Sequence, residues 1–201
     1  CDSLTSVTIP DSVTSIGDYA LASCDSLTGI WVDPNNANYS SDSYGVLFNK
    51  EKTELIQAPG RLTGEYAVPD GVTYISFNAF YGCLDLTAVS LPDGVTTIDA
   101  WAFYDCASLA DINIPASVTK LDSSIFTGCG SLTGIWVDQG NPNYSSDDKG
   151  VLFNKDKTKL IQAPEGISGS YPVPDTVTDI GDFAFSSCTG LTAITIPDSV
   201  T

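Results

Sequence analysis

The chain repeats itself at two nested periods, and this repetition constrains its fold more than any single motif. Its six cysteines stand at positions 1, 24, 83, 106, 129 and 188, so a shift of 105 residues superimposes the first three on the last three. Under that shift, 26 of 33 residues are identical between Leu27–Pro59 and Leu132–Pro164. Periods of roughly 20 to 50 residues are typical of solenoids, in which each turn packs only on its neighbours. The repetition therefore predicts a solenoid.

The short repeat unit is clearest over Leu86–Ser108, and it recurs over Leu4–Ser26 and Leu109–Ser131. Its pattern is L-x-x-I-x-I-P-x-x-V-x-x-I-x-x-x-A-F-x-x-C, and the alternating apolar residues before the proline predict one strand in each turn. Proline ends that strand because it has no backbone N–H to donate to the ladder. In A-F-x-x-C the apolar residues stand three apart, which predicts a short helical turn on the opposite flank.

Two longer units, 27–85 and 132–190, each contain an insert. In each insert, VLFNKEKTELIQAP or VLFNKDKTKLIQAP has two apolar runs around a polar turn, which predicts a β-hairpin. A loop rich in Asn, Asp and Ser precedes it, at Asp33–Ser43 and Asp138–Asp148. Its oxygen atoms are of the kind that calcium binds, but the loop lacks the glycine and terminal glutamate of an EF-hand. Turn formation explains the same residues, so no metal site is expected.

The repeat pattern and the insert together closely resemble the BspA-like (treponemal-type) leucine-rich repeats. The resemblance is carried by Leu4–Cys24, Leu86–Cys106 and Leu109–Cys129, and by the G-V-L-F-N-K-[ED]-K-T motif of the inserts. It implies an α/β leucine-rich-repeat solenoid that is strand-rich, with parallel strands, short helical turns on the opposite flank and β-hairpin inserts. It also implies a secreted or cell-surface protein of bacteria or some protists, in a family commonly associated with adhesion.

The whole chain, 1–201, is expected to form a single solenoid domain. It opens and closes inside a repeat, since Leu191–Thr201 copies Leu4–Thr14, and it contains no methionine. We interpret it as a fragment of a longer array, because solenoids need atypical polar repeats at their ends.

Composition excludes several classes of function. A net charge of −17 with only eight basic residues argues against nucleic acid and against anionic membrane surfaces. No apolar run approaches the roughly 18 residues of a membrane span, so no membrane insertion is expected of this fragment. There is no histidine for metal binding or general acid–base catalysis, and the carboxylates are spread along the repeats. We therefore expect neither an enzyme nor a cofactor.

Each of the six cysteines takes the same place in its turn, three residues before the leucine that opens the next. Equivalent positions in stacked turns form a file, and free cysteine is among the most buried residue types. An even number of cysteines in a surface protein also allows disulfides, but a repeating series pairs no cysteine uniquely. Buried free thiols are the favoured interpretation.

The middle residue of I-x-I-P should point away from the core, because side chains alternate along a strand. Most members of this outward column are small or polar, and the exceptions are two tryptophans. An exposed aromatic among small residues is typical of an anchor in a binding surface. The candidate ligand contacts are accordingly Trp31, Trp136, Asn113 and Ser90. The alternative is that the hairpin insert covers each tryptophan, with Leu47 or Phe48 packed against it. Trp101, at the position also held by Tyr19, Asn78 and Phe183, is expected to pack locally.

These observations favour a non-enzymatic, macromolecule-binding module of a bacterial cell-surface or secreted protein. The expected partner is a host or neighbouring-cell protein or glycan, and the expected state is a monomer. The alternative is a passive spacer that projects another domain and has no ligand of its own. A binding module should keep its exposed tryptophans, whereas a spacer should vary freely at those positions.

Overall fold

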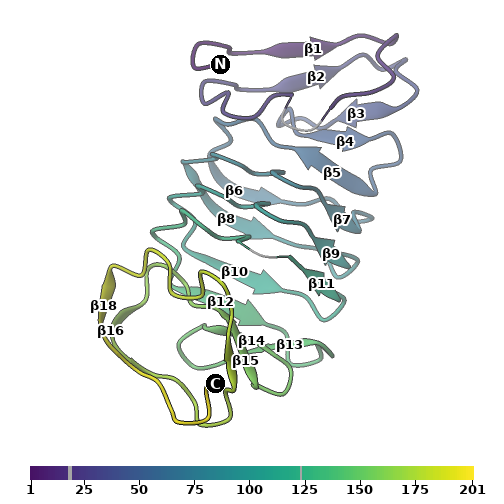
Figure 1. The fold of residues 1–201 in the computed structure, drawn as a ribbon. Coiled ribbons are helices and arrows are strands. Elements are labelled where there is room, and N and C mark those ends of the chain that lie inside the picture. The colour runs from purple at the N-terminus through teal and green to yellow at the C-terminus, as the bar shows by residue number, and fades with distance from the viewer. Residues whose placement is uncertain (18–19, 123) are drawn as a thin grey trace.

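The structure is a computed structural model that describes residues 1–17, 20–122 and 124–201, and the chain winds as a strand-rich solenoid (Figure 1). A first column of parallel strands contains the alternating apolar segment of each turn, I-x-I-P or its counterpart. In chain order its members are β1 (Val7–Ile9), β2 (Ile30–Val32), β6 (Gly64–Ala67), β8 (Leu86–Ser90), β10 (Asp111–Ile114), β12 (Gly134–Val137), β16 (Ser168–Pro172) and β18 (Gly190–Thr195). Paired members are one repeat apart, as in the register of Thr8 with Trp31, which confirms the parallel strands.

In the turns after the first, the V-x-x-I part forms a second, shorter column of strands. It contains β7 (Tyr74–Ile75), β9 (Thr97–Ile98), β11 (Lys120–Leu121) and β17 (Asp179–Ile180). Between the two columns the chain makes a tight turn, closed by a hydrogen bond from the valine N–H to the proline carbonyl. In one repeat Val95 donates to Pro92 at 3.1 Å. The proline thus ends the first strand and also accepts the bond that starts the second.

The inserts contain the predicted hairpins, and each hairpin has an additional strand. The first insert comprises β3 (Tyr39–Ser41), β4 (Leu47–Asn49) and β5 (Glu54–Gln57), and the second comprises β13 (Tyr144–Ser146), β14 (Leu152–Asn154) and β15 (Lys159–Gln162). β4 and β5 pair in antiparallel fashion, as expected. The additional strand, β3, lies in a segment that the sequence predicts as loop. Because β5 pairs in parallel with β7, the insert joins the second column.

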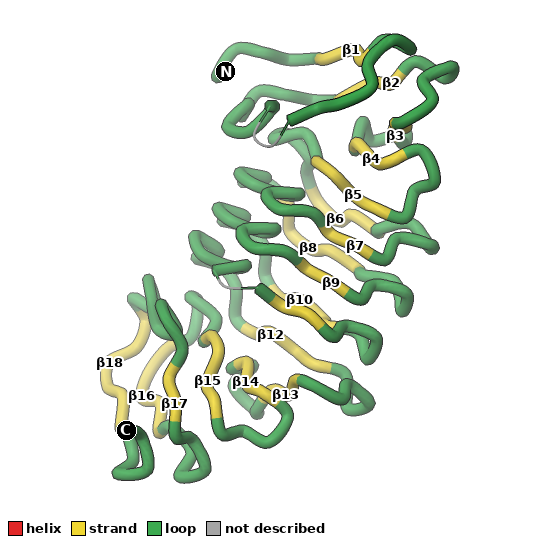
Figure 2. The backbone as a smooth tube through the Cα atoms, turned by 45° about the vertical axis from the view of Figure 1, so that its right-hand side comes forward, coloured by secondary structure: helices red, strands yellow, loops and turns green. Residues whose placement is uncertain are grey.

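The short helical turns expected on the opposite flank are not helices, and none of the described residues is helical (Figure 2). Each A-F-x-x-C segment instead forms successive β-turns, closed in one repeat by hydrogen bonds over Asp99–Ala102 and Phe103–Cys106. The third residue of each turn has a positive φ, 56° at Trp101 and 55° at Asp105. A left-handed residue interrupts the right-handed helical conformation, so the turns cannot propagate into a helix. The described residues accordingly contain no helix that could cross a membrane.

Files of equivalent apolar side chains fill the interior of the solenoid. In the central turns Phe80, Phe103 and Phe126 are fully buried and stacked, with ring centroids 4.9 Å apart for the first two and 5.6 Å apart for the last two. One continuous core extends from Val46 to Leu152, and separate clusters fill the two ends. Each turn is therefore stabilised mainly by its neighbours.

All six cysteines are free thiols, and the central ones form the expected buried file. The thiol of Cys106 donates to the carbonyl of Phe80, one turn earlier, at 3.1 Å. Burial raises the pKa of the Cys83 thiol to about 12. The expectation of burial is wrong for Cys1, which is exposed, and for Cys188, which is half-buried. Both lie in outer turns, where fewer neighbouring turns cover the file.

Native protein treated with a thiol reagent should react quickly at Cys1, more slowly at Cys188 and little elsewhere. The buried thiols resist because the reactive form is the thiolate, which burial disfavours. After denaturation all six thiols should titrate. Mass spectrometry of the non-reduced protein would contradict this result if it found bridged peptides among Cys83, Cys106 and Cys129.

Candidate functional site: the outer face of the first strand column

The predicted outward column is present on the first strand column. Ser90, Asn113 and both tryptophans are exposed, while their neighbours along each strand point inward. Asn113 is in register with Trp136 on β12, and Thr8 is in register with Trp31 on β2. β8 pairs with β10, so Ser90, Asn113 and Trp136 follow one another across a single sheet. Three of the four candidate residues are thus brought together, and Trp31 lies apart on another sheet.

Each tryptophan lies over the glycine two residues before it in the chain. A Cβ atom on Gly29 would come within 2.5 Å of the Trp31 indole, and the same clash would occur between Gly134 and Trp136. Because the glycine has no side chain, the indole can lie flat along the backbone and cover the glycine. Trp31 remains 41% exposed and Trp136 37% exposed. These rings are half-exposed platforms rather than freely projecting side chains.

The inserts do not bury the tryptophans. Leu47 and Phe48, which the alternative interpretation packed against Trp31, are themselves fully buried in the core. They lie in β4, which belongs to the sheet of the second column, whereas Trp31 is on the outer surface of the first column. The physical reason is that β4 enters the solenoid wall as an additional strand and does not fold over the face.

The tryptophan-bearing strands lie where the first column is interrupted. β2 pairs with β1 alone, and β12 is the last strand of the sheet β12-β10-β8-β6. A short segment of the insert lies beside each of them, since Ile30 donates its N–H to Gly45 and Ile135 donates to Gly150, both at 2.9 Å. Gly45 has a φ of 71°, and a Cβ atom there would lie 2.5 Å from the Cα of Gly29. Only glycine fits such a close approach, so each tryptophan lies at a step in the face.

At the first step the insert supplies a further exposed aromatic that sequence reasoning missed. Tyr44 is exposed, and its ring meets the edge of Tyr66 with a centroid distance of 5.5 Å. Tyr66 in turn donates its hydroxyl to Asp42 at 2.7 Å, and its burial, followed by that bond, raises its pKa. The second copy has Lys149 in place of Tyr44. The sequence signal that could have pointed to Tyr44 was this difference between the copies, because the two segments are otherwise nearly identical.

The loops considered for calcium use their side chains to hold the backbone. Asn141, fully buried, donates its amide to the carbonyls of Pro115 (2.8 Å) and Val118 (2.9 Å), and its Oδ1 accepts from the N–H groups of Asn143 and Tyr144. Asn36 makes the equivalent bonds in the first copy. Across the described ranges there is no group of three or more His, Cys, Asp or Glu that could hold a metal ion.

On the turn flank, Trp101 packs locally as expected but remains partly open. Its ring stacks on Phe77 at 5.5 Å and lies 5.7 Å from Tyr104, while 38% of the residue stays exposed. Asn78 and Phe183 share its left-handed conformation, and Tyr19 lies outside the described residues.

Parallel strands one repeat apart, prolines at the strand ends and files of equivalent apolar side chains define a leucine-rich-repeat solenoid, a fold that is typically non-catalytic. The chain matches the family described as BspA type leucine rich repeat region in six copies, over residues 1–63, 61–168 and 169–201. It belongs to that family. No curated protein matches the chain.

Solved structures of bacterial proteins have the same fold. A leucine-rich repeat protein from Eubacterium ventriosum is 26% identical with a TM-score of 0.72, over 96% of this chain and 49% of that one. A leucine rich cell surface protein from Faecalibacterium prausnitzii is 26% identical with a TM-score of 0.64, over 98% and 62%. The pneumococcal vaccine antigen PcpA, at 23% identity and a TM-score of 0.64 over 98% and 51%, shows the fold alone. The chain thus spans less than two thirds of each of these proteins.

Proposed function

We propose that this solenoid is a macromolecule-binding module of a bacterial cell-surface or secreted protein, and that its first strand column contacts the partner. The observation that carries the proposal is the pair of half-exposed indoles. Each lies flat over a glycine, at the place where an insert interrupts a face of otherwise small and polar residues. Aromatic residues with one open face supply much contact area at little cost in conformational entropy. The Faecalibacterium relative, described as a cell surface protein, supports the location.

The charge of the face favours a neutral or basic partner, a protein or a glycan. Glu65 on β6 and Asp111 on β10 are exposed on other strands of the first column, and the chain as a whole carries a charge of −17. Acidic partners would be repelled at long range. The two tryptophans recur 105 residues apart, so a ligand with repeated epitopes could engage both sites and gain avidity of tenfold or more, an order-of-magnitude expectation for linked sites.

Alanine at Trp31 or Trp136 should weaken binding to a partner selected from immobilised extracellular-matrix proteins and oligosaccharides by about tenfold, equivalent to about 1.4 kcal/mol. The melting temperature should change little, because substitutions of exposed residues usually alter stability by about 0.5 kcal/mol or less. Both quantities are measurable by biolayer interferometry and calorimetry on the purified chain.

Leu84→Ala is the matched control, since Leu84 is an exposed large apolar residue on the turn flank. It should leave binding unchanged. A fall of many degrees in melting temperature without a selective loss of binding would place the tryptophans in the core and remove the support for this function. A chain that binds none of the immobilised partners would instead fit a passive spacer.

A further inference from the structure

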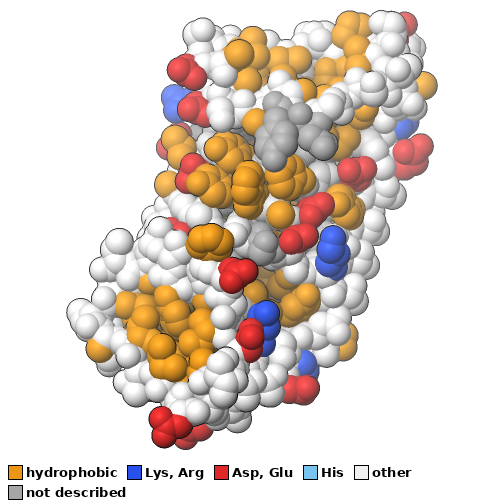
Figure 3. All heavy atoms as spheres, viewed as in Figure 1, with side chains coloured by type: hydrophobic (Ala, Val, Ile, Leu, Met, Phe, Trp, Pro, Cys, Tyr) orange, Lys and Arg blue, Asp and Glu red, His pale blue; other side chains and the backbone are white. Residues whose placement is uncertain are grey.

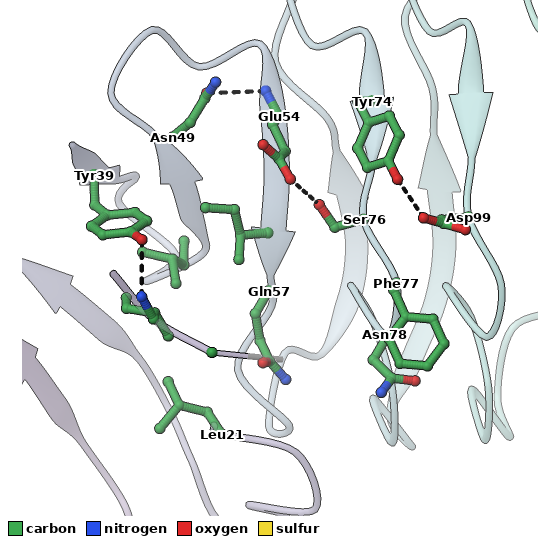
Figure 4. Close-up of a pocket in the computed structure, with 14 residues that line it drawn as sticks. Leu21, Tyr39, Asn49, Glu54, Gln57, Tyr74, Ser76, Phe77, Asn78 and Asp99 are labelled. Atoms are coloured by element: carbon green, nitrogen blue, oxygen red, sulfur yellow. Dashed lines mark hydrogen bonds between the residues drawn. The ribbon is translucent and has the colours of Figure 1, made fainter. Parts of the chain in front are cut away.

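Each long repeat forms a partly open cavity between its insert and the adjoining turns. The first, of about 370 Å³, lies among β3, β4, β5, β7 and the preceding turn (Figure 4). The second, of about 380 Å³, occupies the equivalent place in the second long repeat. In both, a tyrosine hydroxyl accepts a backbone N–H from the turn before, Tyr39 from Ile16 and Tyr144 from Leu121, at 3.0 Å. Both volumes fall in the range of roughly 300–1,000 Å³ that is usual for small-molecule sites.

The wall of the first cavity is rich in polar groups that converge from different strands. Glu54 on β5 accepts a hydrogen bond from Ser76 at 2.7 Å, and Tyr74 on β7 donates its hydroxyl to Asp99. These bonds hold the carboxylates in place, and Asp99 also accepts the backbone N–H of Ala100 at 2.9 Å on its other oxygen. Each carboxylate oxygen has two lone pairs and can accept a further donor. The amides of Gln57 and Asn78 extend from the same wall, and no hydrogen bond joins them to the other residues drawn there (Figure 4).

Asn78 is the feature of this cavity that most calls for a ligand. It is 3% exposed, and neither its Nδ2 nor its Oδ1 has a hydrogen-bond partner among the described residues. A buried polar group without a partner costs about 1–3 kcal/mol, and such groups are rare in native proteins. A partner that both donates and accepts, supplied from outside the chain, would satisfy the amide.

An aromatic platform borders the cavity. Phe77 lines it and stacks on Trp101, and the neighbouring pair Tyr81 and Tyr104 stacks with ring centroids 5.2 Å apart. Hydrophobic side chains gather on the face of the molecule over these turns (Figure 3). Trp101 has a φ of 56°, as the third residue of its β-turn, and this conformation sets the direction of its side chain. The turn thus holds a large ring open to solvent beside a polar cavity.

We infer that the first cavity and its aromatic border, formed by Glu54, Gln57, Phe77, Asn78, Asp99 and Trp101, are a binding site for a neutral saccharide. A sugar ring has an apolar C–H face that packs on aromatic rings, and hydroxyl groups that both donate and accept. Those hydroxyls would donate to the two carboxylates and would pair with the two amides. The described residues that line the cavity include no Lys or Arg, so an acidic sugar would be repelled by Glu54 and Asp99. This site is separate from the strand face proposed above for the macromolecular partner.

The second cavity serves as an internal control because its chemistry differs at equivalent positions. Lys159, Asp179 and Phe183 replace Glu54, Tyr74 and Asn78, the last without any amide. Lys159 pairs with Asp179 at 3.1 Å. A ligand that depends on the unpartnered amide should therefore bind only the first cavity.

The test is a titration of the ¹⁵N-labelled chain with four neutral disaccharides: maltose, lactose, cellobiose and diacetylchitobiose. 3′-Sialyllactose serves as the acidic comparison. At least one neutral disaccharide should shift the side-chain amide signals of Gln57 and Asn78 and the indole signal of Trp101, while those of Gln162 stay in place. Sialyllactose should shift none of them. If none of the neutral disaccharides moves these signals, or if sialyllactose moves them equally, the assignment is overturned.

Two variants separate binding from stability. Asn78→Gly removes the unpartnered amide at a left-handed position that glycine adopts freely, so the melting temperature should hold while saccharide affinity falls about tenfold. Gln57→Ala should also lose about tenfold, and its counterpart Gln162→Ala in the second cavity should lose nothing. A lower melting temperature for Asn78→Gly, or equal losses for the two glutamine variants, would contradict the site. Trp31→Ala should leave disaccharide binding at the first cavity unchanged. The strand face and the cavity can therefore fail their tests independently of each other.

Discussion

Replacing Phe103 by alanine should lower the free energy of unfolding by about 3–5 kcal/mol, the range for removing a buried aromatic side chain. The ring is fully buried in a middle turn and stacks between Phe80 and Phe126. Its removal would leave a cavity that rigid turns on both sides cannot fill. Because the turns couple only to their neighbours, the loss should propagate to the adjacent turns first. Urea denaturation measures the free energy, and hydrogen exchange locates the weakened turns.

Two further substitutions control for size and position. Phe183 is an exposed phenylalanine on the same flank, and its replacement by alanine should change stability by about 0.5 kcal/mol or less. Leu21 is half-buried, so Leu21→Ala should cost less than Phe103→Ala. Equal losses at Phe103 and Leu21 would contradict a stack of turns that derives its stability from buried nearest-neighbour contacts.

Asn141→Ala should destabilise the protein on the order of 3–5 kcal/mol, although the residue lies in a polar loop. The amide has four hydrogen bonds, two to carbonyls of the preceding turn and two from its own loop. Each buried group left without a partner costs about 1–3 kcal/mol, and water entering the site would recover part of that. Asn143→Ala removes an exposed amide from the same loop and should cost little. Similar losses in both variants would contradict the role of Asn141 as the link between insert and preceding turn.

Asn141→Asp adds a pH dependence with a definite sign. The new carboxyl would be fully buried, with one oxygen facing the carbonyl oxygens of Pro115 and Val118 and the other accepting two backbone N–H groups of its own loop. We expect burial and the carbonyl oxygens to outweigh the two N–H groups, so the charged form is disfavoured and the folded pKa of the carboxyl is raised. A raised folded pKa gives stability that is present below the unfolded pKa and is lost as the pH rises through the folded pKa. The stability gap between this variant and the native chain should therefore widen between about pH 4 and pH 7. A gap independent of pH would show that the carboxyl reaches solvent.

Much of the fold was predictable because a solenoid converts sequence period into spatial register. Residues one short repeat apart, such as Asn113 and Trp136, became partners on adjacent strands for that reason. The insert hairpins and the central cysteine file follow from the same local patterns. The outward position of the tryptophans also follows, since alternation along a strand is a property of the backbone itself.

The flank opposite the first column was mispredicted because apolar residues three apart suit both a helical turn and successive β-turns. Gly82 and Gly128 precede two of the cysteines and were a partial signal for turns. At Asn78, Trp101 and Phe183 no glycine announces the left-handed conformation. At these three positions the stacking of neighbouring turns imposes the left-handed conformation, which the local sequence alone would not favour.

The sequence by itself determined the period, the strand columns, the insert positions and which side chains face outward. Only the tertiary structure decided that β3 and β13 join the two hairpins, that the indoles lie over Gly29 and Gly134, and that a cavity forms beside Asn78. The first group depends on contacts that recur at a fixed spacing along the chain. The second depends on how an insert of one length fits against turns of another, and that fit is a property of packing in three dimensions.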